Sequence, residues 1–287
     1  MQKTPSIRLL LALSSSAVLA GCLATGNPQL DTAMNAGGSL FQAATLSDDD
    51  IAKLSDQACA EQDATNKVAA PGSKYDRRLQ SIVKGMEPTV NGRTINYKVY
   101  QTDDVNAWAM GNGCVRVYSG LMDKMTDDEV RGVVGHEIGH VALGHSKRAM
   151  QLAYTTKAAR DASGLAGASV AALSQPQLGD IAESFVNAQF SQSQETAADN
   201  YSYDQLKAKG FRREGLATAF EKLAAGSSGT TSATARMFSS HPESLARAEN
   251  IRTRIAADGG DAPAAPAPKA AAKKKPAAKK STTTAAQ

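Results

Sequence analysis

The sequence lacks the hydrophobic runs that cross a membrane as helices. Beyond the first 21 residues, its most apolar stretch is GLAGASVAAL, from Gly164 to Leu173, and that is about half of the roughly 20 residues that a bilayer requires. It also lacks an internal repeat of the kind that builds solenoids. These absences exclude a bundle of transmembrane helices and a repeat array, and they leave a globular domain.

Cysteines are also scarce, and none is placed at the CxxC spacing of cysteine-rich zinc sites. The three are Cys22, Cys59 and Cys114, which disfavours a metal role for them. Because Cys22 belongs to the N-terminal export segment described below, an even pair is left in an oxidising compartment. That predicts one disulfide between Cys59 and Cys114, with two buried thiols as the alternative.

The central part of the chain lacks a surplus of positive charge. The formal net charge is +4, but residues 261–287 contribute +5 and the first 21 residues contribute +2, which leaves −3 for the rest. A mildly acidic globular part provides no basis for a nucleic-acid-binding surface. We therefore expect no nucleic-acid partner.

The N-terminus has the parts of an export signal. Lys3 and Arg8 form a charged segment, and an apolar segment follows from Leu9 to Ala20, too short for a stop-transfer helix. It ends in LAGC, at Leu19 to Cys22. This looks like a bacterial lipobox, in which the cysteine is acylated and becomes the first residue of the mature chain. An ordinary cleaved signal peptide with a chance cysteine is the alternative.

These parts predict a domain organisation and a location. We expect a signal peptide at residues 1–21, a lipidated tether at 22–45 and a folded domain at 46–257. Several acyl chains on one residue are enough for stable anchoring. Leu23, rather than an aspartate, follows the acylated cysteine, which favours the periplasmic face of the outer membrane.

The last 30 positions, 258–287, are rich in Ala, Pro and Lys. They contain almost no apolar bulk to bury, so we expect a disordered basic tail. The tail is either a flexible spacer or a salt-sensitive contact to anionic envelope polymers or acidic proteins.

The folded domain is expected to be α+β, mainly helical, with a small antiparallel sheet. Residues Thr94–Thr102 alternate and are rich in β-formers, and VNAWAMGNGCVRVYSG (Val105–Gly120) indicates two short strands joined around Gly111–Gly113. A capping box from Thr126 to Glu129 opens a long helix. Helices are expected from Ser47, from Ser73, from Thr126 through the histidine-rich stretch, and at about 151–173, 179–190, 192–209, 213–225 and 242–257.

Three of the four histidines lie within ten residues, in VVGHEIGHVALGH, which ends at His145. His136 and His140 are four residues apart on the predicted helix, so their side chains lie about 40° apart on one face and can reach one zinc ion. Glu137 borders that face, where it can act as general base on a water activated by the metal. His145 would face away on the same helix, and we expect it at the surface or at the helix end.

A catalytic zinc ion needs a third protein ligand. The metzincin pattern would require Gly at 143 and His at 146, but Leu143 and Ser146 stand there. The best candidate lies in FSQSQETAADNYSYD, where Glu195 and Asp199 are four residues apart on a predicted helix. Glu195 could complete a His₂Glu site and Asp199 could orient a ligand histidine. Taken alone, this spacing is equally consistent with a solvated helix face.

HEIGH followed by ExxAD resembles the gluzincin metallopeptidases of the HtpX and CAAX-prenyl-protease type. The similarity extends through DVNAWAMGNGCVRVYSGLM before the motif and SSHPESLARAENI after it, and it covers roughly residues 46–257. It implies a zincin fold, one zinc ion per chain and endopeptidase activity. It also implies that His136, His140 and Glu195 bind zinc and that Glu137 is catalytic.

The resemblance leaves some residues open. Family members often have Arg three residues before the ligand glutamate, where this chain has Gln192, so an ion pair from that position is in doubt. His241 is either a residue near the zinc, as oxyanion donor or blocking fourth ligand, or simply a residue at a helix start before Pro242.

The segment Asn106–Ala109 (Asn106, Ala107, Trp108 and Ala109) is a candidate edge strand along the cleft. An extended substrate would add to it through backbone hydrogen bonds. An ordinary core strand with a buried tryptophan is the alternative, and the two can both hold on opposite faces.

Together with the lipobox, the resemblance implies an outer-membrane lipoprotein that degrades unfolded or misassembled envelope proteins. Other envelope assembly or protease factors are further candidate partners. One alternative is a zinc-stabilised periplasmic chaperone or assembly factor with little proteolysis, which the intact Glu137 disfavours. A structural lipoprotein acting through its basic tail and a zinc hydrolase of another amide bond, such as a wall amidase, are the others.

Overall fold

The computed structural model describes residues 46–160, 170, 173–227, 237, 240–241 and 244–263. The expected signal peptide, the tether with Cys22, Pro242 and the basic tail beyond residue 263 lie outside these residues. Within them, no helix is both long enough and apolar enough to cross a membrane.

The fold is α+β and mainly helical, as the sequence predicts. Its elements, in chain order, are α2 (Asp48–Thr65), α3 (Lys74–Val83), β1 (Thr89–Val90), β2 (Arg93–Thr94), β3 (Asn96–Tyr100), β4 (Ala107–Ala109), β5 (Cys114–Tyr118), α4 (Ser119–Lys124), α5 (Asp127–Ala142), α6 (His145–Arg160), α7 (Gln175–Val186), α8 (Gln192–Ala208), α9 (Glu214–Ser227) and α11 (Ser244–Ala257).

The main sheet has three strands in the order β3-β5-β4. β4 and β5 form the predicted hairpin and pair antiparallel. β3 and β5 pair parallel, so the sheet is mixed rather than purely antiparallel. Residue alternation predicts strands but not their order in the sheet. Because β5 lies between β3 and β4, β3 pairs with β5, and this pair is parallel. β1 and β2 form a separate two-stranded antiparallel ribbon.

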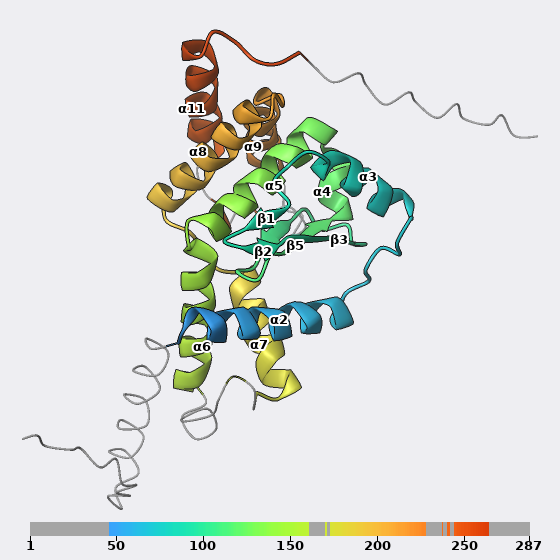
Figure 1. Ribbon diagram of the computed structural model, residues 1–287, viewed down its shortest axis with the longest axis vertical. Helices are drawn as coiled ribbons and strands as arrows, with labels where there is room; N and C mark the ends of the chain where they lie inside the picture. Colours follow the sequence, from blue (N-terminus) through green and yellow to red (C-terminus); the bar gives the residue numbers. More distant parts are fainter. Residues whose placement is uncertain are drawn as a thin grey trace, which may run out of the picture.

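The central strand β5 is buried on both faces. Val115 and Val117 join a core cluster with residues of α5, α8, α9 and α11, whereas Cys114 and Tyr118 join a second cluster with α2, α6 and α7. Because successive side chains of a strand point to opposite faces, the sheet separates two cores. In Figure 1, α2, α6 and α7 lie together on one side of the sheet, away from α8, α9 and α11.

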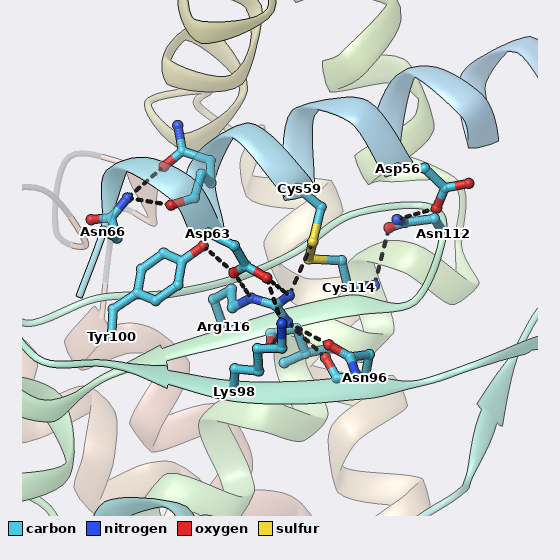
Figure 2. The surroundings of a disulfide bond; sticks show 12 residues. Asp56, Cys59, Asp63, Asn66, Asn96, Lys98, Tyr100, Asn112, Cys114 and Arg116 are labelled. Atoms are coloured by element: carbon cyan, nitrogen blue, oxygen red, sulfur yellow. Dashed lines mark hydrogen bonds and ion pairs between the residues drawn. A yellow bond between two sulfur atoms is a disulfide. The ribbon is translucent and has the colours of Figure 1, made fainter. Parts of the chain in front are cut away.

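The expected disulfide is present and joins the helix α2 to the central strand. Cys59 and Cys114 are bonded across 55 positions of sequence, so the alternative of two buried thiols is wrong. Nearby, the Asn112 side chain donates to Asp56 at 2.7 Å. Both links hold the β4–β5 hairpin against α2 (Figure 2).

Beside the disulfide lies a buried arginine, Arg116, whose side chain is 1% exposed. Its Nε and Nη2 atoms donate to the two carboxylate oxygens of Asp63 at 2.8 and 2.9 Å. Lys98 and the Tyr100 hydroxyl donate to the same carboxylate (Figure 2). Because a buried charge is tolerated only when it is paired and hydrogen-bonded, this network satisfies the guanidinium under α2.

The long helix predicted from Thr126 is in fact two helices. α5 begins with the predicted capping box, in which Thr126 and Glu129 cap each other's backbone. It ends at Ala142, and Gly144 has a φ of 75°. That left-handed conformation suits glycine and terminates a helix. The chain therefore turns before α6 begins at His145. The direction of the His145 side chain cannot be predicted from a helix that continues from α5.

The folded part also extends beyond the predicted boundary at residue 258. Arg213 at the start of α9 donates to Asp258 at 3.0 Å and to Asp261 at 3.1 Å. The first residues assigned to the tail are therefore attached to the domain.

Helix α5 packs unusually closely on α8 through two glycines. A Cβ atom at Gly135 would come within 2.5 Å of Ser202 Oγ, and one at Gly139 within 2.9 Å of the Ala198 carbonyl oxygen. Real Cβ atoms do not approach so closely, so any larger residue would push the helices apart. These two positions therefore allow residues of α8 to reach the histidine face of α5.

We expect Gly139→Ala to lower the free energy of unfolding by about 1–3 kcal/mol, because the added methyl overpacks the α5–α8 contact. The matched control is Gly179→Ala in α7, where a Cβ would meet nothing within 4 Å. That change should be neutral or stabilise by up to about 1 kcal/mol. Urea denaturation of the two variants and the parent measures the difference, and equal effects at both positions would contradict this account of the contact.

Candidate metal centre

Helix α5 carries the histidines of HEIGH into the interior. His136 and His140 are each 1% exposed, and their Nε2 atoms lie 3.0 Å apart. Glu137, the residue between them on the helix, is also buried. The spacing of four residues therefore brings the two imidazoles to one point, as the helical period requires.

Helix α8 brings Glu195 to the same point. Its Oε1 lies 3.2 Å from His140 Nε2 and its Oε2 lies 3.5 Å from His136 Nε2. The side chain is 1% exposed, so the alternative of a solvated helix face is wrong.

The fourth histidine of the chain, His241, also belongs to this cluster. Its Nδ1 lies 3.2 Å from His136 Nε2 and 3.0 Å from Glu195 Oε1. One donor atom from each of His136, His140, Glu195 and His241 lies within 4.8 Å of the others. The other ring nitrogen of His241, Nε2, faces Glu137 Oε1 at 3.6 Å.

The donor set fits a zinc ion. Three imidazole nitrogens and a carboxylate oxygen are ligands that zinc prefers, and bond lengths of about 2.0–2.1 Å place neighbouring ligand atoms of a tetrahedral site roughly 3.3 Å apart. The observed separations between His136, Glu195 and His241 are 3.0 to 3.5 Å. In addition, Glu137 Oε1 is buried and has no hydrogen-bond partner among the described residues, so a polar group is needed beside it.

Asp199 lies behind the cluster, one turn further along α8. Its Oδ1 accepts a hydrogen bond from His136 Nδ1 at 2.8 Å. This leaves the lone pair of His136 Nε2 directed at the cluster, which is the orientation of a metal-binding imidazole. The structure therefore places Asp199 where the sequence predicted it, beside a candidate ligand.

Sequence reasoning missed Arg247, on α11. The side chain is buried, donates to both carboxylate oxygens of Asp199 at 2.7 and 2.8 Å, and contacts Glu195 Oε2 at 2.5 Å. The ion pair that seemed in doubt because of Gln192 therefore comes from a different helix. The only signal in the sequence was its position in SSHPESLARAENI, where nothing local distinguishes it from a surface arginine.

Burial and neighbouring charges together determine the protonation of these groups. Burial raises the pKa of Glu137 above its ordinary value and lowers the pKa of His140 well below its own. Burial also opposes ionisation of Glu195, but His241 and His136 outweigh it and hold the pKa of that carboxyl low. The site therefore offers a neutral imidazole and a carboxylate, which are the protonation states that bind metal.

The sequence predicted His145 at the surface or at a helix end, facing away from the site. The residue is 7% exposed, and its Nδ1 lies 3.0 Å from His140 Nδ1. The residue does lie at a helix end, as the first residue of α6, but it is buried and faces His140, because α5 does not continue through it. The turn at Gly144 starts a new helix and returns His145 to the back of the His140 ring.

A pocket opens beside Glu137 and His241, and β4 and Phe190 line it. Among the strands that the structure describes, β4 lies at an edge of the sheet. The Asn106 carbonyl accepts from the Tyr118 amide of β5, and the Met110 amide donates to the Cys114 carbonyl. Asn106 and Trp108, at alternate positions of this pattern, therefore turn their backbone groups toward β5. In the alternating antiparallel pattern, Ala107 and Ala109 point their backbone groups away from β5. Of the four predicted positions, only these two suit strand addition.

Trp108 also meets the alternative expectation of a core residue. It is 4% exposed, and its ring makes edge contacts with Tyr100 and Phe185. On the other side of the pocket, Phe190 stacks on His140 with a centroid separation of 3.9 Å. The core reading of Trp108 is confirmed, and substrate binding along the strand stays a prediction.

The mainly helical α+β fold, with HExxH on the buried helix α5 and a glutamate on α8, defines a zinc metallopeptidase of the gluzincin class. The pattern of Peptidase family M48 matches residues 73–255, and the chain belongs to this family.

Full-length relatives have the same activity in their names. The chain is 51% identical over 251 residues to Metalloprotease LoiP of Escherichia coli (strain K12), covering 88% of this chain and 97% of that protein. It is 50% identical over 250 residues to Metalloprotease YcaL of the same strain, covering 87% and 97%. Protease HtpX of Actinobacillus pleuropneumoniae serotype 5b (strain L20) is 50% identical over 81 residues, covering 27% and 28%. The expected resemblance is confirmed, and the enzyme is a zinc metalloprotease.

We expect Arg247→Lys to weaken zinc binding about 10–100-fold, the usual cost of losing a group that orients metal ligands. A lysine cannot bridge Glu195 and Asp199 as the planar guanidinium does. Arg254→Lys, on the same helix, is the control, because Arg254 pairs with Asp204 at the surface and should have no effect. Competition with a chelator of known affinity measures zinc binding, and equal affinities in the two variants would refute the bridging role.

Proposed function

We propose that this metalloprotease is an endopeptidase that cleaves extended segments of unfolded proteins, with His136, His140 and Glu195 as its zinc ligands and Glu137 as its general base. The observation that carries the proposal is the convergence of these buried groups beside the open edge of β4. An edge strand binds the backbone of an extended chain and makes few demands on its sequence.

The substrate is proposed to lie antiparallel or parallel along β4. The Ala109 carbonyl already accepts a hydrogen bond from Ser146 Oγ at 2.8 Å. The Ala107 amide donates to Asn106 Oδ1 at 2.9 Å. That leaves the Ala107 carbonyl and the Ala109 amide for the substrate backbone. A folded protein cannot supply such a strand inside a narrow pocket, and this favours unfolded substrates.

Glu137 is proposed to accept the proton of the attacking water and to pass it to the departing amine. Bound zinc supplies a Lewis acid that polarises the scissile carbonyl and makes water more acidic. Burial raises the pKa of Glu137, which makes its carboxylate a stronger base than an exposed one. The side chain is held beside, and not inside, the cluster of donor atoms, where a water can fit against its free oxygen.

His241 is proposed to cover the position that a substrate carbonyl needs. Its Nδ1 stands where a fourth donor would be, 3.2 Å from His136 Nε2, and a catalytic site requires that position to be open. In this proposal His241 moves aside when substrate binds. It is then proposed to donate a hydrogen bond to the developing oxyanion.

The location and the natural substrates are proposed from the sequence. The lipobox at Cys22 supports an acylated protein on the periplasmic face of the outer membrane, and that compartment supports unfolded or misassembled envelope proteins as substrates and other envelope assembly or protease factors as partners. The chaperone alternative finds less support, because a holdase needs no carboxylate poised against a metal site.

Glu137→Gln tests the mechanism. We expect the variant to keep one zinc ion per chain, because Glu137 is not a proposed ligand, and to cleave unfolded casein about 10²–10⁴-fold more slowly. Zinc is measured by atomic absorption and cleavage by release of labelled peptides, with a chelator-treated parent as the reference for zero activity. Undiminished cleavage by the variant would remove Glu137 from the mechanism.

Cys22→Ser tests the anchor. The variant should lose labelling by radioactive palmitate and appear in the soluble periplasmic fraction, because no acyl chain can be attached. The double variant Cys59→Ser, Cys114→Ser serves as control and should keep both the label and the outer-membrane fraction. Membrane retention of Cys22→Ser would show that the protein is held there by something other than lipid.

A further inference from the structure

The back of the His140 ring is occupied by another histidine. His140 Nε2 faces Glu195 Oε1 at 3.2 Å, while its Nδ1 faces His145 Nδ1 at 3.0 Å. No other hydrogen-bond partner for His140 Nδ1 occurs in the described part of the chain. His140 is thus arranged like His136, whose Nε2 faces the cluster and whose Nδ1 is hydrogen-bonded to Asp199.

The chemistry of an imidazole ligand determines which of the two Nδ1 atoms, that of His140 or that of His145, donates the hydrogen bond. A neutral histidine that offers the lone pair of Nε2 carries its proton on Nδ1. His140 Nδ1 is therefore the donor, and His145 Nδ1 has to accept with its own lone pair. This in turn places the proton of His145 on Nε2, the ring nitrogen on the side away from His140.

We propose that His145 is a positioning residue for zinc binding, which holds His140 in its ligating tautomer and orientation through an Nδ1–H···Nδ1 hydrogen bond. The inference rests on the proposed role of His140 as a ligand and extends it to a residue outside HEIGH. HEIGH alone does not contain this hydrogen-bond acceptor, because His145 lies five positions beyond His140, after the chain has turned.

The surrounding structure fixes His145 in this position. Gly144 supplies the turn that starts α6 at His145. The neighbouring Ser146 is tied to the edge strand by its hydrogen bond to the Ala109 carbonyl. The first turn of α6 is therefore anchored at a point fixed relative to α5, so the imidazole does not have to be ordered when zinc binds, which lowers the entropic cost of holding His140.

The two ligand histidines are consequently supported by unlike partners. Asp199 is a carboxylate that is itself bonded by Arg247, whereas His145 is a neutral acceptor. A charged acceptor raises the basicity of the ligand that bonds it more than a neutral one does. His136 and His140 are therefore inequivalent ligands, with His136 the stronger donor.

Two substitutions separate the hydrogen bond from simple packing. His145→Leu fills much of the same space but offers no acceptor, and His145→Asn places an amide oxygen close to the position of Nδ1. We expect the zinc dissociation constant, measured by competition with a chelator, to rise about 10–100-fold in His145→Leu. In His145→Asn it should stay within about threefold of the parent. The melting temperatures of the two zinc-free variants should agree, since their difference lies in metal binding.

Equal losses of affinity in both variants would assign His145 to packing, and no loss in His145→Leu would remove it from the site; either result overturns the proposal. Because zinc affinity is measured without substrate, the outcome does not depend on whether the enzyme is an endopeptidase.

A measurement on the unmodified, zinc-loaded protein tests the same bond without a substitution. With ¹⁵N-labelled histidine, we expect His145 as the Nε2–H tautomer and a scalar coupling across the hydrogen bond between the Nδ1 nitrogens of His140 and His145. A proton on Nδ1 of His145 would overturn the proposal even if His145→Leu failed to fold.

Discussion

The close contact between α5 and α8 is the constraint on which the metal centre depends. Two of the donor atoms project from α5 and a third from α8, so their separation is set by the distance between the helix backbones. Gly135 and Gly139 permit that distance because they have no Cβ atoms. The short reach of a glutamate side chain then suffices for Glu195 to meet both imidazoles, and the contact is part of the site as much as the ligands are.

Charge balance explains why so many ionisable groups can be buried there. Glu137, Glu195 and Asp199 are three carboxylates inside the protein, and Arg247 is the buried cation that contacts two of them. With all three carboxylates ionised, a divalent ion would bring the net charge of these groups and Arg247 to zero. Because an uncompensated charge in the interior is costly, the same groups that select zinc by their chemistry also favour its binding by their charge. Arg247 prevents the two carboxylates on α8 from repelling each other.

The turn between α5 and α6 links the candidate metal centre to the edge strand β4. It ends the ligand helix at Ala142, returns His145 to the rear of His140, and ties Ser146 to β4. On the opposite face of the sheet, α2 is held to β5 by the disulfide and by the Arg116–Asp63 pair. The edge strand, the ligand helix and the start of α6 are thereby parts of one rigid frame, which suits a site that has to be preorganised.

The sequence alone determined the features that depend on local spacing. The four-residue interval of His136 and His140, the capping box of α5 and the turn between β4 and β5 follow from the periods of helices and strands. The role of Glu195 needed the wider motif, because one interval on a helix does not distinguish a ligand from a surface residue.

Tertiary structure decided the rest, because it depends on contacts between distant segments. The parallel pairing of β3, the bridge made by Arg247 and the seclusion of Trp108 all join segments that sequence periodicity cannot relate. His145 shows the limit most clearly. The left-handed Gly144 ends α5, so the side chains after it no longer follow the period of that helix. A helical period predicts directions only as far as the helix continues, and where it stops is a matter of backbone geometry and packing.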